Sequence, residues 1–198
     1  MLEILEQLVD QSMVVAEPGD EFAMRFRLLE PLRQFAAEHL ELRGEADRVR
    51  RRHALYYVRI GEEFGAQWSR RDPDRIAHLE LELDNVRAGL RWLILQHDAE
   101  AAVQLAGAAA SVWLERGFGT EGRSWLREVL ALPTSKSTVA RVRALLYTSV
   151  LAAEQGDHPA AYPPLEAAAT MARSSATIKA WRTRSSGWPK WPGSGAIS

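Results

Sequence analysis

Residues 98–133 read DAEAAVQLAGAAASVWLERGFGTEGRSWLREVLALP, and this stretch decides the fold that we expect. Asp98 is a good N-cap for an alanine-rich helix, which we expect to end at Gly117. Thr120 is the expected N-cap of a second helix, which ends near Pro133. Two helices joined by a tight glycine turn predict an α-hairpin.

A second copy of this pattern follows. A short linker at 134–137 precedes a long helix to Gly156, and a last helix is expected after Asp157. When Gly117 is placed on Gly156, an offset of 39 residues, small residues meet small ones and apolar residues meet apolar ones. The agreement is in residue class and not in identity. It predicts stacked α-hairpins, in which each hairpin buries its apolar side against the next.

The N-terminal half carries the strand signal. A helix is expected over residues 2–10, and two short apolar runs within 13–28 flank the turn at Pro18 and predict a β-hairpin with one buried face. The remaining chain shows helical spacing, with apolar stripes over 31–43, 45–64 and 72–93. We therefore expect an all-α chain with one β-hairpin, followed by the stacked α-hairpins.

Composition limits the function. The chain has 198 residues, 46% of them hydrophobic, and a net charge of −1, so no overall field attracts nucleic acid or an anionic membrane. It has no cysteine, which excludes disulfides and thiolate sites. The acidic, amphipathic N-terminus is unlike a signal peptide, and no apolar run is long enough to cross a bilayer. Together these features predict a cytoplasmic protein.

The hairpins resemble tetratricopeptide repeats, and residues 1–173 resemble a stretch of bacterial LuxR-type and related signal-transduction (STAND) ATPases. The segments that carry this resemblance are LEQLVDQSMVV (5–15), RFRLLEPLRQFAAEHL (25–40), RRRHALYYVRIGEE (50–63), ELELDNVRAGLRWLI (80–94) and EGRSWLREVLAL (121–132). The resemblance implies the last part of a winged-helix domain at 1–43, bridging helices at 44–97 and tetratricopeptide-like repeats at 98–173. It also implies a nucleotide-binding module upstream, because no phosphate-binding loop motif occurs in this sequence.

Large aromatic side chains are the candidates for partner binding. Trp92, Trp113 and Trp125 could line a groove that receives a peptide, since aromatic residues often anchor binding. The alternative, which we favour for each one singly, is packing between hairpins. Arg116 and Arg123 flank the same turn and could contact an acidic partner.

Contact with DNA is the rival function. Arg25 and Arg27 stand at the outward positions of the presumed wing and could contact the DNA backbone, or could keep an exposed strand soluble. The basic run at 48–52 is flanked by acidic residues, which favours a solvated helix face. We expect nucleic-acid binding to be the weaker interpretation.

No group of residues predicts catalysis, a cofactor or a metal. Glu80, Glu82 and Asp84 follow one another in two-residue steps, which point in different directions on a helix. His53 lies on an apolar stripe, where a hydrogen-bonded core histidine is favoured over a ligand. We expect a non-catalytic scaffold whose partners are proteins, either a separate partner or the upstream nucleotide-binding module.

The C-terminal part departs from this pattern. All 26 acidic residues lie at or before Glu166, and residues 174–198 hold tryptophan, proline and serine without a helical stripe. This segment is either an out-of-frame tail or a natural disordered one. Pro163 and Pro164 fall inside the last expected helix, where they predict a break or a late start. An exposed apolar end of the stack predicts weak self-association.

Overall fold

The computed structural model describes residues 2–18, 24–65, 73–134, 136 and 138–174. The chain divides into two compact units, Met1–Arg50 and Arg51–Ser198, which we call the N-terminal unit and the stack unit. The helical fold class with one β-hairpin is confirmed, since helices make up most of the described chain and β1 and β2 form a two-stranded sheet.

The N-terminal unit contains α1 (Leu2–Asp10), β1 (Val14–Pro18), β2 (Met24–Leu28), α2 (Glu30–Leu42) and the first turn of α3. The strands are antiparallel, with Val14 opposite Leu28 and Pro18 opposite Met24. Proline lies in the first turn of α2, where its missing N–H is tolerated. After α2, Gly44 adopts the left-handed conformation with φ of 65°, which stops the helix as the sequence predicts.

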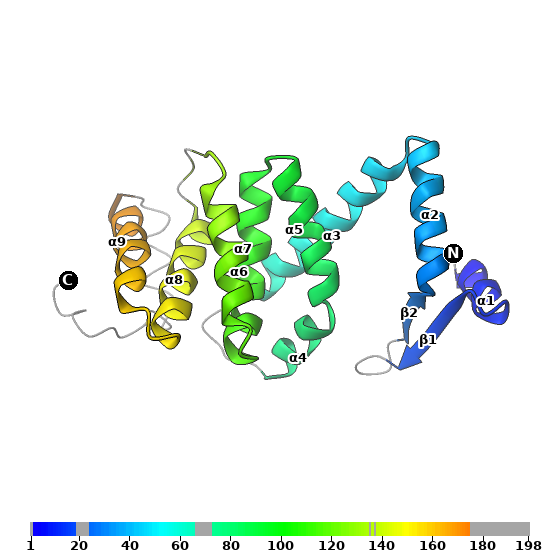
Figure 1. Cartoon of the computed structure of the whole chain (residues 1–198), viewed down its shortest axis with the longest axis horizontal. Helices are drawn as coiled ribbons and strands as arrows, with labels where there is room; N and C mark the ends of the chain where they lie inside the picture. The colour runs from blue at the N-terminus through cyan, green and yellow to red at the C-terminus, as the bar shows by residue number, and fades with distance from the viewer. Residues whose placement is uncertain (1, 19–23, 66–72, 135, 137, 175–198) are drawn as a thin grey trace. The chain divides into compact units, whose positions relative to one another are not determined.

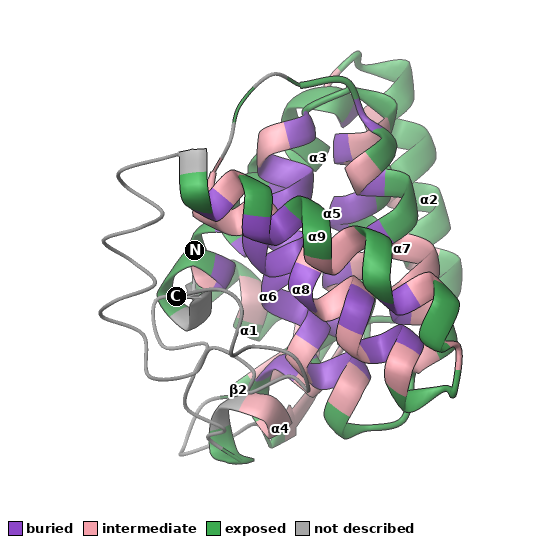
Figure 2. Ribbon diagram, turned by 90° about the vertical axis from the view of Figure 1, so that its left-hand side faces the viewer, coloured by how far each residue is buried: buried purple, intermediate pink, exposed green. Residues whose placement is uncertain are grey.

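The expected burial in this unit is wrong. Met24, Phe26 and Leu28 are between 41% and 55% exposed, so the described part of the hairpin does not bury the face that they form. The predicted apolar stripe of α2 also lacks a buried residue along the whole helix (Figure 2). Phe35 on this stripe is 57% exposed. An amphipathic pattern marks the apolar face, but it becomes buried only where enough side chains pack against it.

Helices packed side by side build the stack unit. Its elements are α3 (Ala46–Gly65), α4 (Pro73–Leu81), α5 (Leu83–Leu95), α6 (Ala99–Glu115), α7 (Gly119–Ala131), α8 (Val139–Glu154) and α9 (His158–Ser174). From α5 to α9 each helix packs beside the next, and α8 also packs on α6 (Figure 1). Among the described residues, no helix is long and apolar enough to cross a membrane.

Local signals at the helix ends were predicted with mixed success. The side chain of Asp98 accepts a hydrogen bond from the backbone N–H of Ala101 at 3.2 Å and caps α6, as expected. The prediction for Thr120 is wrong, because α7 begins at Gly119 after Phe118 and has no side-chain cap. The tight turn at Gly117, where φ is 75°, leads through Phe118 directly into α7.

The helix expected over residues 72–93 is in fact two helices. The chain turns at Glu82, which separates α4 from α5. The carboxylate of Glu82 accepts hydrogen bonds of 2.7 Å from the Tyr57 hydroxyl of α3 and from the Asn85 side chain. These contacts with a distant helix hold a turn that the apolar spacing of the segment does not reveal.

A continuous core runs through α3 to α8. Trp113 of α6 is fully buried in it, together with Leu90, Leu126 and Val129. A Cβ at Gly122 would lie 2.8 Å from the Cβ of Trp113, so the glycine permits the close approach of α6 and α7. The small and large residues of the repeat thus interlock across the hairpin.

The last hairpin has a second, smaller cluster of buried side chains, formed by Val142, Leu146, Ala168 and Ala172. Contrary to the predicted break, α9 continues from His158 to Ser174 with Pro163 and Pro164 inside it. The buried hydroxyl of Ser149 on α8 donates a 2.7 Å hydrogen bond to the Ala161 carbonyl, beside the prolines. Packing against α8 therefore outweighs the local preference.

Candidate partner-binding surface

The predicted tryptophans lie in different surroundings. Trp113 is completely buried in the core of the stack, so its ring serves packing in this structure. Trp92 and Trp125 are partly buried and pack against the edge of the same core. A binding role for Trp92 and Trp125 remains a prediction. Of the two, Trp125 lies beside more polar side chains.

Trp125 belongs to a polar cluster between α5 and α7, formed by Arg87, Arg91, Glu121 and Trp125, which we call the α5–α7 cluster. Arg87 donates two hydrogen bonds to Glu121, from Nε at 2.6 Å and from Nη2 at 2.8 Å. The indole N–H of Trp125 donates to the same carboxylate at 3.1 Å. The guanidinium of Arg91 lies 6.0 Å from the centre of the Trp125 ring, at the outer limit of a cation–π contact.

The interaction between Arg87 and Glu121 favours the charged forms of both side chains. The hydrogen bonds from Arg87 lower the pKa of Glu121, and burial opposes this shift only in part. The same carboxylate raises the pKa of Arg87, mainly through its hydrogen bonds. The pair is bidentate and about 28–29% exposed on each side chain, so it ties α5 to α7 more firmly than an ordinary surface ion pair.

Arg116 and Arg123, the predicted arginines, are engaged in ion pairs. The Arg116 Nε lies 2.7 Å from a carboxylate oxygen of Glu80, which links the end of α6 to α4. Arg123 donates to Asp157 at 2.7 Å and to Gln155 at 2.8 Å, which links α7 to the turn before α9. The hydrogen bond from Arg123 also lowers the pKa of Asp157.

These ion pairs repeat along the stack. Arg87 and Glu121 are 34 residues apart, and so are Arg123 and Asp157. Each pair joins one hairpin to the next one. Glu121 and Asp157 were not predicted as partners, although opposite charges separated by the length of one helical repeat are a signal that could have identified both.

The acidic residues considered for catalysis are separated in the structure. Glu80 pairs with Arg116, Glu82 with Tyr57 and Asn85, and Asp84 with Arg87 at 2.6 Å. His53 is partly buried, and its Nε2 lies 3.3 Å from the side-chain oxygen of Asn85, in agreement with a hydrogen-bonded core histidine. Among the described residues, no group of three or more histidine or acidic side chains could hold a metal ion.

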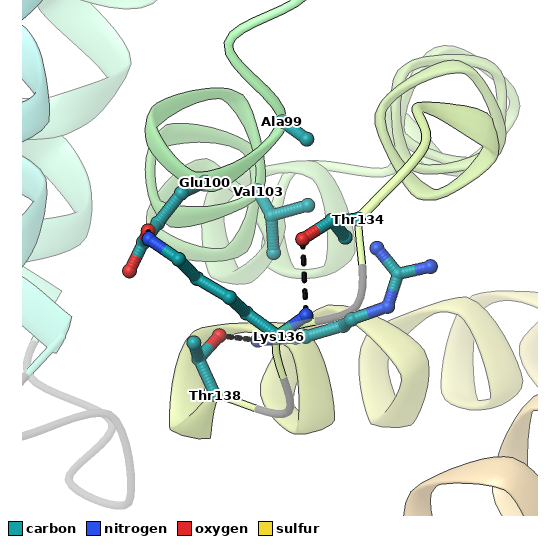
Figure 3. Close-up of a pocket in the computed structure, with 7 residues that line it drawn as sticks. Ala99, Glu100, Val103, Thr134, Lys136 and Thr138 are labelled. Atoms are coloured by element: carbon teal, nitrogen blue, oxygen red, sulfur yellow. Dashed lines mark hydrogen bonds and ion pairs between the residues drawn. The ribbon is translucent and has the colours of Figure 1, made fainter.

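A small pocket lies between the start of α6 and the linker before α8 (Figure 3). The side chains of Lys136 and Glu100 form an ion pair across it. Arg141 lines it as well and donates from Nη2 to the Leu130 carbonyl at 2.9 Å. The cavity measures about 10 Å³, which has room for about one water molecule and not for an organic ligand.

Arg25 and Arg27 lie on β2, and both carry side chains near Glu17. Glu17 is directly opposite Arg25 in the strand register, and it accepts a 3.0 Å hydrogen bond from Nη2 of Arg27. The Arg27 side chain is 62% exposed. Contact with a phosphate backbone would compete with this ion pair, so the structure leaves the DNA interpretation as a prediction.

Comparisons with known proteins find relatives that are named as transcriptional regulators. The chain is 34% identical over 155 residues to proteins of Mycobacterium tuberculosis and Mycobacterium bovis, each named "Putative HTH-type transcriptional regulator". The match covers 76% of this chain but 17% of each relative, so the chain corresponds to a small section of those proteins. No known family matches the chain, and no solved structure does.

Proposed function

We propose that this chain is a non-catalytic protein–protein interaction scaffold within a transcriptional regulator of the LuxR-type, signal-transduction ATPase kind. The observation that carries the proposal is the stack of α-hairpins, in which α6, α7 and α8 share one core and ion pairs join successive hairpins. Stacked hairpins offer an extended surface for partners. The relatives named as transcriptional regulators support the setting.

The N-terminal unit offers the contact with the nucleotide-binding module that the resemblance implies. Met24, Phe26 and Phe35 are each more than two-fifths exposed. Val14 and Ala46 are the buried apolar residues among those described in this unit, too few to stabilise a hairpin and two helices. A partner that covers the exposed side chains would supply the missing core.

The α5–α7 cluster offers the second contact. Trp125 is partly exposed and lies beside Arg91, whereas Arg116 and Arg123 are already held by carboxylates of the stack. Trp92 is partly buried and packs against the core of the stack. Because ion pairs tie the hairpins together, a signal that binds here would move the hairpins as one body and change the contact with the nucleotide-binding module.

A bacterial two-hybrid assay tests the first contact. This chain is paired with the part of the M. tuberculosis relative that precedes the matched section. We expect an interaction that the double substitution Phe26→Ser and Phe35→Ser weakens at least tenfold, because both side chains would be buried by the partner. Leu95→Ser is the matched control, since Leu95 is 74% exposed but lies in the stack unit. Equal signals from the two variants would contradict the proposal.

Direct DNA binding is the alternative, and the name of the relatives fits it at least as well as it fits the scaffold. The chain would contact DNA through Arg25 and Arg27. Fluorescence anisotropy with a labelled random duplex, at about 50 mM and about 200 mM salt, tests it. A salt-dependent affinity that Arg25→Ala with Arg27→Ala removes, and that the control Arg33→Ala retains, would establish the alternative. No binding at the lower salt would remove it.

A further inference from the structure

The part of α3 that belongs to the stack unit has a buried side and an exposed side. The buried side packs in the main core through side chains that include Ala54, Tyr57 and Val58. Along the other side runs a line of four exposed residues: Arg52, Tyr56, Arg59 and Glu63. Their spacing of four, three and four residues places them on one face of the helix. We call this line the α3 seam.

Opposite charges stand at the two ends of the α3 seam. Arg52 begins it and Glu63 ends it. None of Arg52, Arg59 and Glu63 forms an ion pair with a described residue. Arg50, earlier in the same helix, is by contrast paired with Glu41. The charges of the seam are therefore available to a partner.

The middle of the α3 seam offers an aromatic surface. Tyr56 is 49% exposed, and the neighbouring Leu55 is 40% exposed. The guanidinium of Arg59 lies over the Tyr56 ring, 5.5 Å from its centre, within the range of a cation–π contact. A planar guanidinium beside an aromatic ring forms a surface on which a second pair of the same kind can stack.

A second copy of α3 in antiparallel orientation matches this order of side chains. In a two-fold interface every contact occurs twice, once from each copy. When the axis passes between Tyr56 and Arg59, Tyr56 faces Arg59 of the second copy. Arg52 and Glu63 each lie four residues further out, so Arg52 faces Glu63 of the second copy. Opposite charges then meet at both ends of the seam.

Other occupants match the α3 seam less well. A nucleic-acid backbone or an acidic peptide could pair with Arg52 and Arg59. It would, however, be repelled by Glu63 and by Glu62, which is also exposed. A basic peptide would meet the reverse conflict with the arginines. A second copy satisfies both ends, because it presents the same two charges in reverse order.

We propose that two copies of the chain associate through antiparallel pairing of the α3 seam. The paired stretch is about 18 Å of helix, which buries less than the roughly 1,200 Å² of a standard interface. We therefore expect a weak, reversible dimer with a Kd of about 10–100 µM. The dimer does not depend on the proposed scaffold function. It assigns the self-association expected from the sequence to α3 instead of the end of the stack.

Sedimentation equilibrium of the full chain at several concentrations tests the proposal. Arg52→Glu or Glu63→Arg alone places like charges opposite each other twice in the dimer. Each single reversal should therefore weaken association at least about tenfold. The double variant, which carries both reversals, has opposite charges at both ends again and should recover the wild-type Kd within about threefold.

A mixture of the two single variants gives the sharpest test. The Arg52→Glu chain is acidic at both ends of the seam, and the Glu63→Arg chain is basic at both ends. A mixed dimer therefore has opposite charges at both ends, whereas neither variant alone can form one. We expect the equimolar mixture to associate at least as tightly as the wild type. Arg127→Glu, an exposed charge reversal on α7, is the matched control and should leave the Kd unchanged.

Several results would overturn the proposal. One is a wild-type chain that remains monomeric at roughly 0.5 mM. Another is a dimer that both single reversals leave unchanged, since association would then use a different surface. Loss of the dimer in both single variants without recovery in their mixture would contradict the two-fold pairing. Association that added sodium chloride does not weaken would also overturn it, because salt screens exposed ion pairs.

Discussion

Helices of the N-terminal unit and of the stack unit have similar apolar patterns but very different burial. In α2 the stripe that includes Leu32 and Phe35 contains no buried residue. In α5 and α6 the corresponding stripes are buried almost completely, with Leu90, Leu93 and Trp113 at 0% exposure. The difference teaches that periodicity identifies which side of a helix is apolar, whereas neighbouring elements decide whether that side is covered.

The largest expected effect tests this comparison directly. Trp113→Ala removes a fully buried ring from the core and should lower the free energy of unfolding by about 3–5 kcal/mol. Phe35→Ala removes an aromatic ring from α2 that is 57% exposed. It should change the free energy of unfolding by less than about 0.5 kcal/mol. Urea unfolding followed by circular dichroism measures both. Similar losses would show that Phe35 is buried in solution and would break the comparison.

Glycine substitutions in the two units should destabilise the protein for different reasons. Gly122→Ala places a methyl group 2.8 Å from the Cβ of Trp113, and this overpacking should cost about 1–3 kcal/mol. Gly44→Ala in the N-terminal unit has open space around it, so its cost of about 1 kcal/mol comes only from the positive φ. Substitution to Asn, which tolerates positive φ better, should therefore restore stability at Gly44 more than at Gly122.

Ion pairs should show the same contrast with smaller effects. Arg87→Met breaks the bidentate pair with Glu121, in which both side chains are mostly buried, and should cost about 1–2 kcal/mol. Arg27→Met breaks an exposed pair with Glu17 and should cost less than about 0.5 kcal/mol. Urea titration of both variants provides the test. A cost for Arg27→Met as large as that for Arg87→Met would mean that the hairpin packs more tightly than its exposure indicates.

The dependence on pH gives the smallest effect. The folded state lowers the pKa of Glu121 below its ordinary value of 4.5, so the pair stabilises the fold fully above pH 4.5. That contribution is lost as the pH falls from 4.5 through the folded pKa. The free-energy difference between the wild type and Glu121→Gln should shrink over that range. In the Arg87→Met background the same substitution should show little pH dependence, and an unchanged profile would assign the effect to another group.

Several helix ends were predicted correctly from local signals, although the N-cap at Thr120 was not. The cap at Asp98 and the left-handed glycines Gly44, Gly117 and Gly156 fixed helix ends that the structure confirms. The turn at Glu82 was missed, because its hydrogen-bond partner Tyr57 lies 25 residues away. A local pattern cannot reveal a partner that only folding brings near.

The candidate site shows the same limit. Trp125 and Arg123 were predicted as candidates but Glu121 was not, although its carboxylate accepts hydrogen bonds from Trp125 and from Arg87, which lies 34 residues away. That contact depends on the separation of successive hairpins in space, which composition and periodicity do not specify.

The separate cluster of the last hairpin has a consequence for the dynamics of the molecule. Val142, Leu146, Ala168 and Ala172 hold α9 to α8, whereas Ala144 and Leu151 on another side of α8 belong to the main core. Pro163 and Pro164 also leave two backbone carbonyls of α9 without their usual helical donors. Amide hydrogens of α9 should therefore exchange with solvent through a partial opening that leaves α5, α6 and α7 folded. In that open state α8 would expose its outer side, while the ion pairs between α5 and α7 remained intact.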